Sequence, residues 1–202
     1  MAELYAIVGT LERARLMLAA KVPYLQLRIK DRPLAPHVNE IAAWAREFPA
    51  TRLIVNDDLE LAVSAEAWGV HLGQEDVMRY APSDLAGAPL RVGISTHTDE
   101  EIRRALELGA AAIGFGPVFA SATKTLAHEP QGVARLREVV AQAPVPVVAI
   151  GGIGPENLLP VAETGVAMIA MISALERFAD SASLASLMAA MKKPEPDEAP
   201  AE

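Results

Sequence analysis

The sequence contains no cysteine, and this absence removes three kinds of chemistry. A chain without cysteine forms no disulfide framework, holds no zinc through thiolates and has no cysteine nucleophile. Basic residues are also scarce, because 18 Lys and Arg stand against 26 Asp and Glu and leave a formal net charge of −8. A nucleic-acid surface needs clustered Lys and Arg, so we expect no nucleic-acid partner.

Long hydrophobic runs and targeting signals are missing as well. No apolar run approaches the roughly 20 residues that span a bilayer. The first residues, Met1 to Tyr5, include an acidic residue and show neither a basic region nor a cleavage-type tail. We therefore expect a cytoplasmic protein with no membrane partner.

The length of 202 residues and a hydrophobic fraction of 51% predict one globular domain. Short runs rich in Val, Ile and Leu alternate with amphipathic stretches, as expected of βα units around a parallel sheet. The predicted strands are Leu4 to Val8, Tyr24 to Arg28, Leu53 to Val55, Gly69 to Leu72, Arg91 to Ile94, Ala112 to Phe115, Val147 to Ile150 and Ala167 to Ile172. The predicted helices are Leu11 to Ala20, Pro36 to Phe48, Leu59 to Ala67, Asp99 to Leu108, Gly132 to Ala141 and Glu156 to Thr164.

About eight such alternations predict a compact α/β fold, a single (β/α)₈ TIM barrel over residues 1–191, with a doubly wound open sheet as the alternative. Residues 192–202 are rich in proline and acid, so we expect a disordered tail there. Thr98 and Glu101 form a capping box at one helix start, and Pro155 is typical of a first helical residue at another. Three glycines are expected to end helical stretches before strands: Gly69, Gly109 and Gly165.

Polar residues follow several of the buried strands, at the end where such barrels carry out chemistry. The segment Tyr24 to Lys30 alternates, so Gln26, Arg28 and Lys30 share one face, which we expect to point into the barrel mouth. A solvated edge strand would give the same pattern.

Carboxylates follow the next two predicted strands, in Asn56-Asp57-Asp58 and in Gln74-Glu75-Asp76. Neighbouring strands lie about 5 Å apart, so Asp57 and Asp76 can converge on one hard cation such as Mg²⁺. Either aspartate alone is better explained as a helix N-cap, and Asp57 or Asp58 can cap the helix that starts near Leu59.

Two later loops suggest phosphate binding. The segment Ser121 to Thr125 contains Lys124 and three hydroxyl groups, although a flexible polar loop is the simpler interpretation of this segment alone. Gly151 to Gly154 and Ser173 follow the last two predicted strands, where barrels commonly bind phosphate, but glycine turns also arise for steric reasons. The four histidines lack metal-ligand spacing, and we expect His71 and His97 to have structural or supporting roles.

Seven ordered motifs resemble those of thiamine phosphate synthases and their TenI-like relatives, over Leu4 to about Phe178. The motifs are Gln26-Leu27-Arg28-Ile29-Lys30, Asn56-Asp57, His71-Leu72-Gly73-Gln74-Glu75-Asp76, Gly93-Ile94-Ser95-Thr96-His97, Gly114-Phe115-Gly116-Pro117-Val118-Phe119 with Thr123-Lys124, Gly151-Gly152-Ile153 and Ile172-Ser173.

The resemblance implies an enzyme, a transferase that joins hydroxymethylpyrimidine diphosphate to hydroxyethylthiazole phosphate and releases pyrophosphate through a pyrimidine-methyl cation. It implies that small phosphorylated molecules are the partners and that Mg²⁺ is the cofactor. The implied roles are diphosphate binding by Arg28, Lys30 and Lys124, Mg²⁺ binding by Asp57 and Asp76, orientation of the pyrimidine and diphosphate by Gln26 and Asn56, hydrogen bonding of the leaving group by Ser95, and thiazole phosphate binding by Ser121, Thr123, Gly152, Ile172 and Ser173.

The chain departs from the family pattern near its start, where the first βα connection is short and the N-terminal region is expected to be shortened. Ile29 replaces the family's usual glutamate, and Ala120 and Ser121 stand where proline and threonine are usual. A TenI-like thiazole tautomerase and a non-catalytic barrel that binds thiamine phosphate are the alternatives, because fold does not determine function. Such tautomerases tend to carry a histidine near the position of Pro117. Homo-oligomers are common among such barrels, so a homo-oligomer is one possible state, but nothing in the sequence specifies its interface.

Overall fold

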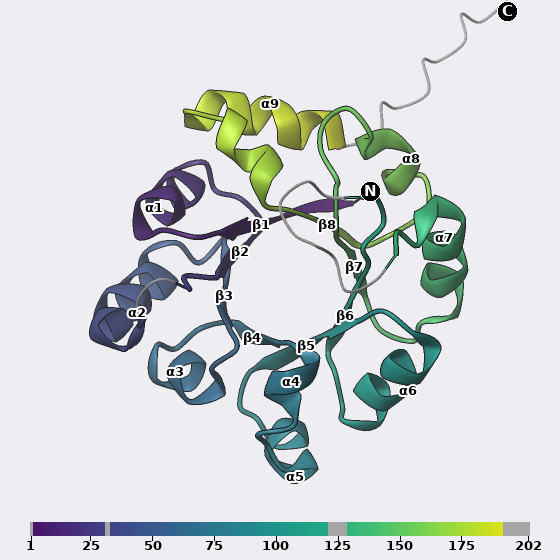
Figure 1. Ribbon diagram of the computed structural model, residues 1–202. Coiled ribbons are helices and arrows are strands. Elements are labelled where there is room, and N and C mark those ends of the chain that lie inside the picture. Colours follow the sequence, from purple (N-terminus) through teal and green to yellow (C-terminus); the bar gives the residue numbers. More distant parts are fainter. Residues whose placement is uncertain (1, 31–32, 121–128, 192–202) are drawn as a thin grey trace, which may run out of the picture.

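In the computed structural model, parallel strands form a closed barrel that is surrounded by helices (Figure 1). The structure describes residues 2–30, 33–120 and 129–191. The strands are β1 (Glu3–Val8), β2 (Tyr24–Leu27), β3 (Arg52–Asn56), β4 (Gly69–Leu72), β5 (Arg91–Thr96), β6 (Ala112–Phe115), β7 (Val147–Ala149) and β8 (Met168–Met171). Each strand pairs with the next and β8 pairs with β1, so the sheet has no edge. The predicted (β/α)₈ barrel is confirmed, and an open sheet is excluded.

Helices on the outside connect the strands. They are α1 (Leu11–Ala19), η1 (Ala35–His37), α2 (Val38–Glu47), α3 (Leu59–Ser64), α4 (Gln74–Val77), α5 (Pro82–Ala86), α6 (Asp99–Glu107), α7 (Gly132–Gln142), α8 (Leu158–Ala162), η2 (Ser173–Arg177) and α9 (Ser181–Met191). The connection from β1 to α1 is only Gly9 and Thr10, and the Thr10 hydroxyl accepts a hydrogen bond from the Arg13 amide. This agrees with the short first connection expected from the sequence.

The alternation of residues along each strand separates two apolar layers. Side chains that point inward fill the barrel: Tyr5, Ile7, Tyr24, Ile54, Val148, Met168 and Ala170. Side chains that point outward, such as Leu25 and Leu27 on β2, pack between the barrel and the helices. Gln26 therefore points inward although it is polar, and only 2% of its surface is exposed. A buried amide of this kind needs hydrogen-bond partners.

Some predicted helix boundaries are wrong. Gly69 does not end a helix, because α3 ends at Ser64 and Glu66 takes the left-handed turn with φ of 52°. Pro155 is not the first residue of α8, because the Asn157 side chain accepts a hydrogen bond from the Gly154 amide and the helix begins only at Leu158. The capping box of Thr98 is confirmed. Helices α4, α5 and α9 were not predicted, since α4 and α5 are too short to show a helical period.

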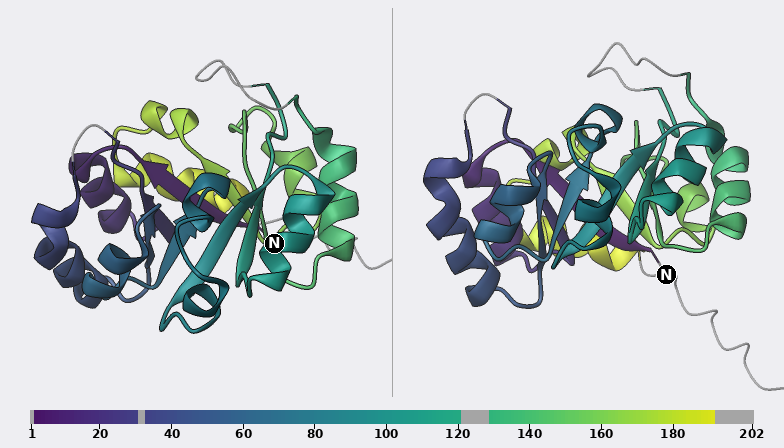
Figure 2. Two further views of the ribbon diagram at one scale, coloured as in Figure 1. Left: turned by 60° about the horizontal axis from the view of Figure 1, so that its bottom comes forward. Right: turned by 90° about the horizontal axis from the view of Figure 1, so that it is seen from below.

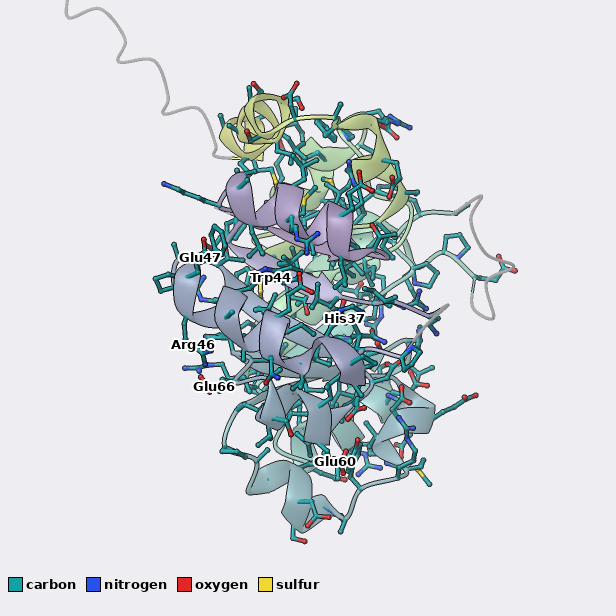
Figure 3. All side chains as sticks on the ribbon, turned by 90° about the vertical axis from the view of Figure 1, so that its left-hand side faces the viewer. His37, Trp44, Arg46, Glu47, Glu60 and Glu66 are labelled. Atoms are coloured by element: carbon teal, nitrogen blue, oxygen red, sulfur yellow. The ribbon has the colours of Figure 1, made fainter. Side chains whose placement is uncertain are left out.

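The outer helices carry most of the charge, and Figure 3 shows His37, Arg46 and Glu66 on the outside of the molecule. Arg46 Nη1 donates to Glu66 Oε2 at 2.8 Å, which ties α2 to the end of α3. In the part of the chain that the structure describes, no helix is long and apolar enough to cross a membrane. Residues 192–202, predicted to be a disordered tail, lie outside the described residues.

Candidate active site

A cavity of about 470 Å³ opens at the carboxyl ends of the strands. Every strand contributes to its wall, either directly or through a residue just after the strand. The wall includes Ile7, Gln26, Arg28, Asn56, His71, Ser95, Thr96, His97, Gly114, Gly116, Pro117, Ile150, Gly151, Gly152, Ile153, Ala170, Ile172 and Ser173. This is the end at which barrels of this type hold their active sites.

Gln26 on β2 and Arg28 just after it line this cavity, as predicted, whereas the prediction that Lys30 does so is wrong. Gln26 Nε2 donates to Asn56 Oδ1 at 2.9 Å, so the amides on β2 and β3 hold each other in place. Arg28 lines the cavity beside them, while Lys30 is exposed outside its wall. The edge-strand interpretation is wrong, because β2 is paired on both sides.

Asp57 and Asp76 meet at the ends of β3 and β4. Burial raises the pKa of Asp57, a side-chain hydrogen bond with Asp76 and the charge of Asp76 raise it further, and Lys30 and Arg28 partly lower it. The two carboxylates repel each other, and this repulsion favours the neutral form of Asp57. A divalent cation between them would relieve the same repulsion.

The neighbouring Asp58 resolves which aspartate caps α3. Its Oδ1 atom accepts a hydrogen bond from the Leu61 amide at 2.8 Å, whereas Asp57 has a left-handed backbone with φ of 67° and faces Asp76. Asp76 also has a structural role, because Oδ2 accepts from the Gly73 amide at 3.1 Å and Oδ1 accepts from Arg79 Nη2 at 2.6 Å. Asp76 is therefore not the N-cap of α4, which is Gly73, but it stabilises the start of that helix from the third helical position, and its binding of a cation stays a prediction.

The donor set fits a hard cation that is held only in part by protein. Among the described residues, no group of three or more His, Cys, Asp or Glu side chains could hold a metal ion. Mg²⁺ commonly binds through one or two carboxylates, and substrate phosphate and water complete its coordination. Asp57 and Asp76 are such a pair.

Ser95 is held by one residue on β4, His71, and by the first residue of α4, Gln74. His71 Nε2 lies 2.9 Å from Ser95 Oγ, and Gln74 Nε2 donates to the Ser95 carbonyl at 2.6 Å. Burial and, to a smaller extent, the charge of Arg28 lower the pKa of His71, and Asp76 partly raises it; the resulting pKa is about 4, so the imidazole is neutral near pH 7. Sequence reasoning did not assign His71 and Gln74 to the site, although both belong to the motif that supplied Asp76.

Glycines on two strands make room for His71. A Cβ atom at Gly93 would lie 2.9 Å from His71 Nδ1, and one at Gly114 would lie 3.1 Å from His71 Cε1. The imidazole therefore fills the space where side chains on β5 and β6 would otherwise stand. Gly93 and Gly114, in the motifs around Ser95 and Phe115, therefore leave room for the imidazole of His71, which the spacing of the motifs alone does not show.

The loop after β7 approaches the loop after β6 closely. A Cβ atom at Gly152, whose φ is 63°, would lie 2.4 Å from the Ala120 carbonyl oxygen, so the steric explanation for this glycine holds. The same loop lines the cavity opposite Arg28, together with Ile172 and Ser173 after β8. Asn157 Nδ2 donates to the Gly152 carbonyl at 2.9 Å and fixes the loop.

Three predicted site residues, Ser121, Thr123 and Lys124, lie outside the described residues. Their segment follows Ala120, which touches the glycine loop after β7. The structure brings the other predicted residues to one end of the barrel. Lys30 is exposed, and it acts on Asp57 through its charge.

Comparison with known proteins agrees with this geometry. The family model described as thiamine monophosphate synthase matches residues 4–175. The chain is 42% identical over 181 residues to the thiamine-phosphate synthase of Cronobacter sakazakii, covering 88% of this chain and 86% of the relative. It is 41% identical over 192 residues to that of Anaeromyxobacter dehalogenans, covering 93% and 86% of the two chains.

Solved structures share the fold. The thiamine phosphate pyrophosphorylase from Pyrococcus furiosus superposes with a TM-score of 0.77 at 29% identity, covering 94% of each chain. A 3-hexulose-6-phosphate synthase superposes with a TM-score of 0.65 at 21% identity, covering 94% of this chain and 99% of that one, and this likeness concerns the fold alone. On the family model and the relatives together, the chain belongs to the thiamine monophosphate synthase family.

Proposed function

We propose that this enzyme joins hydroxymethylpyrimidine diphosphate to hydroxyethylthiazole phosphate and forms thiamine phosphate and pyrophosphate. The observation that most supports this reaction is the meeting of Asp57 and Asp76 beside Arg28 and Lys30 at neighbouring strand ends. Two carboxylates and two cations at one mouth suit a diphosphate that arrives with a divalent cation. Family membership supports the same choice.

The bond between the pyrimidine methylene carbon and the diphosphate oxygen breaks first, and its electron pair leaves with the oxygen. Arg28, Lys30 and Lys124 bind the departing diphosphate, where their charges stabilise the negative charge that develops in the transition state. Asp57 and Asp76 would hold Mg²⁺, which would supply further positive charge for the departing diphosphate. The thiazole nitrogen then attacks the methylene carbon, and no general base is required.

Gln26 and Asn56 orient the pyrimidine and the diphosphate through amides that already bind each other. Ser95 donates a hydrogen bond from its hydroxyl to the leaving group. That donation needs His71 to be neutral with a hydrogen on Nε2, because Nε2 then donates to Ser95 Oγ and leaves the Ser95 hydrogen available. The lowered pKa of His71 keeps the imidazole neutral at physiological pH.

The thiazole phosphate binds across the cavity, where Ser121, Thr123, Gly152, Ile172 and Ser173 surround it. The backbone of Gly152 can approach a phosphate closely because no side chain intervenes. This arrangement separates the two phosphate sites, one on the early strands and one on the late strands. The thiazole nitrogen then lies between them, near the methylene carbon of the pyrimidine.

A coupled assay tests this function directly. Purified protein is supplied with Mg²⁺ and both substrates, and thiamine phosphate and pyrophosphate are followed with and without EDTA. We expect both products in equal amounts, and we expect EDTA to abolish them. If folded protein gives neither product but converts a thiazole carboxylate phosphate to its tautomer, the synthase proposal is wrong.

A further inference from the structure

A second cavity, of about 380 Å³, lies at the amino-terminal end of the barrel. Its wall consists mainly of residues at the beginning of strands, including Arg52 on β3, Gly69 on β4 and Arg91 on β5. The right panel of Figure 2 shows the barrel from the side, with the N-terminus at this lower end. His71 lines both cavities, so its imidazole separates this one from the catalytic mouth.

Aromatic rings and guanidinium groups form a continuous row along this cavity, from β1 to β5. The rings of Tyr5 and Tyr24 stack with centroids 5.7 Å apart. Arg52 lies over the Tyr24 ring at 4.7 Å and over the Trp68 ring at 5.8 Å. Arg91 also lies over the Trp68 ring, 4.6 Å from its centroid. The row holds two cations beside flat apolar surfaces.

In this row, the guanidinium of Arg91 and the hydroxyl of Tyr5 can each bind a ligand. Among the described residues, Arg91 has no acidic side chain within ion-pair distance, while Arg52 is paired only with Glu3 at 3.6 Å. Tyr5 is 5% exposed and lines the cavity, yet its hydroxyl has no hydrogen-bond partner in the described part of the chain. Tyr5 lines the cavity, so its hydroxyl can donate to or accept from a ligand there.

We propose that this cavity binds a single planar aromatic ring that carries one anionic group, a carboxylate or a phosphate. The ring packs beside Trp68, whose own ring is nearly perpendicular to that of Tyr24 at 80°, the anionic group binds the guanidinium of Arg91, and the Tyr5 hydroxyl bonds a polar atom of the ring or its substituent. The volume suits a ligand of this size, since small-molecule sites begin at about 300 Å³. The site is independent of the proposed reaction, because it opens at the other end of the barrel.

Trp68 provides a reporter for this binding. The chain has two tryptophans, and Trp44 lies on the outer helix α2, away from the cavity (Figure 3). In the Trp44→Phe variant, Trp68 is the only tryptophan, and its emission is followed during titration with phenyl phosphate. We expect a saturable change, and we expect phenol and inorganic phosphate each to bind at least tenfold more weakly, because each lacks one half of the recognised chemistry.

Arg91→Gln and Arg104→Gln, made in the Trp44→Phe background, locate the binding site. Arg104 is also an exposed arginine but lies on α6 outside the cavity wall. We expect Arg91→Gln to weaken phenyl phosphate binding at least tenfold and to leave synthase turnover unchanged, and Arg104→Gln to change neither. If Arg91→Gln does not fold, Arg91→Lys replaces it and should weaken binding several-fold through the loss of planar stacking. An unsaturable titration, or equal affinity in the Arg91 and Arg104 variants, would overturn the proposal.

Discussion

At the scale of single residues, a substitution at Asp57 separates the effect on turnover from the effect on stability. Asp57→Asn keeps the shape of the side chain but removes the charge that Mg²⁺ needs, so we expect turnover to fall by a factor of about 10² or more. Its melting temperature should change little or rise, because the repulsion between Asp57 and Asp76 disappears. Steady-state kinetics at saturating Mg²⁺ and a thermal melt measure the two effects.

Asp58→Asn is the matched control for this variant. Asp58 is the next residue and caps α3 through Oδ1, and Asn is an equally good N-cap. We therefore expect near-normal turnover and stability. If Asp58→Asn lost as much turnover as Asp57→Asn, the loss would reflect the charge of the whole segment rather than a ligand at Asp57.

His71 links the site to the acid stability of the fold. Its pKa is about 4 in the folded protein and about 6.5 in the unfolded chain, so the unfolded chain binds its proton first as the pH falls. Stability is therefore fully present above about pH 6.5 and is lost as the pH falls toward 4. The loss is on the order of 3 kcal/mol by linkage.

His71→Asn should remove this part of the pH dependence, because asparagine does not titrate. Urea unfolding at intervals between pH 7 and pH 4 measures it, and the free energy of unfolding of the variant should vary less than that of the unmodified protein. The variant should also turn over more slowly at pH 7, since Ser95 loses the donor that orients it. Equal pH slopes for both proteins would show that His71 does not have a depressed pKa.

At the scale of elements, the contact between the loops after β6 and β7 determines the shape of the thiazole phosphate site. Gly152→Ala places a Cβ atom 2.4 Å from the Ala120 carbonyl oxygen, so one of the loops must move. We expect the KM for thiazole phosphate to rise at least tenfold, with a smaller effect on the KM for the pyrimidine diphosphate. Initial-rate kinetics with each substrate varied in turn separate these effects.

Gly132→Ala separates backbone strain from the loop contact. Gly132 also has a left-handed φ, of 76°, but no atom of the described residues beyond its chain neighbours and its own helix lies within 4 Å of its Cβ position. This variant should lose about 1 kcal/mol of stability and keep both KM values. If the two glycine variants affected KM equally, the position of the loop after β7 would not control phosphate binding.

The elements also show which features of the fold and the site can be predicted from the sequence alone. The strand positions were predictable, because buried parallel strands leave apolar runs that stop at polar residues such as Asn56. The convergence of Asp57 and Asp76 followed from strand order. The pairing of His71 with Ser95 was not predictable, because it depends on the register of β4 against β5 and on the absence of side chains at Gly93 and Gly114.

At the scale of the whole molecule, the two ends of the closed barrel carry different kinds of side chain. The carboxyl end gathers opposite charges, in Arg28, Asp57 and Asp76, whereas the amino end gathers aromatic rings and arginines. His71 is the one side chain among the described residues that lines both cavities. Binding at one end can therefore influence the other only through this imidazole or through the barrel wall.

Closure of the barrel also brings α1 next to the segment after β8, and Arg13 links the two by hydrogen bonds. From α1, its Nη1 atom donates to the Phe178 carbonyl at 2.9 Å, and its Nη2 atom donates to the Leu175 carbonyl. The arginine therefore holds η2, which begins at Ser173 in the phosphate site, against the first helix. The Arg13 side chain is 18% exposed, so its hydrogen bonds lie largely out of water.

Arg13→Ala should lower the free energy of unfolding by about 1–3 kcal/mol, because it leaves two carbonyl groups without their charged donor. Arg15→Ala is the control, since Arg15 is on the same helix but makes an exposed ion pair with Glu40, which is worth at most about 1 kcal/mol. Urea unfolding followed by circular dichroism compares the two. If Arg13 holds η2 in place, its variant also raises the KM for thiazole phosphate while Arg15→Ala does not. A loss of stability with an unchanged KM would mean that Ser173 is positioned by β8 alone.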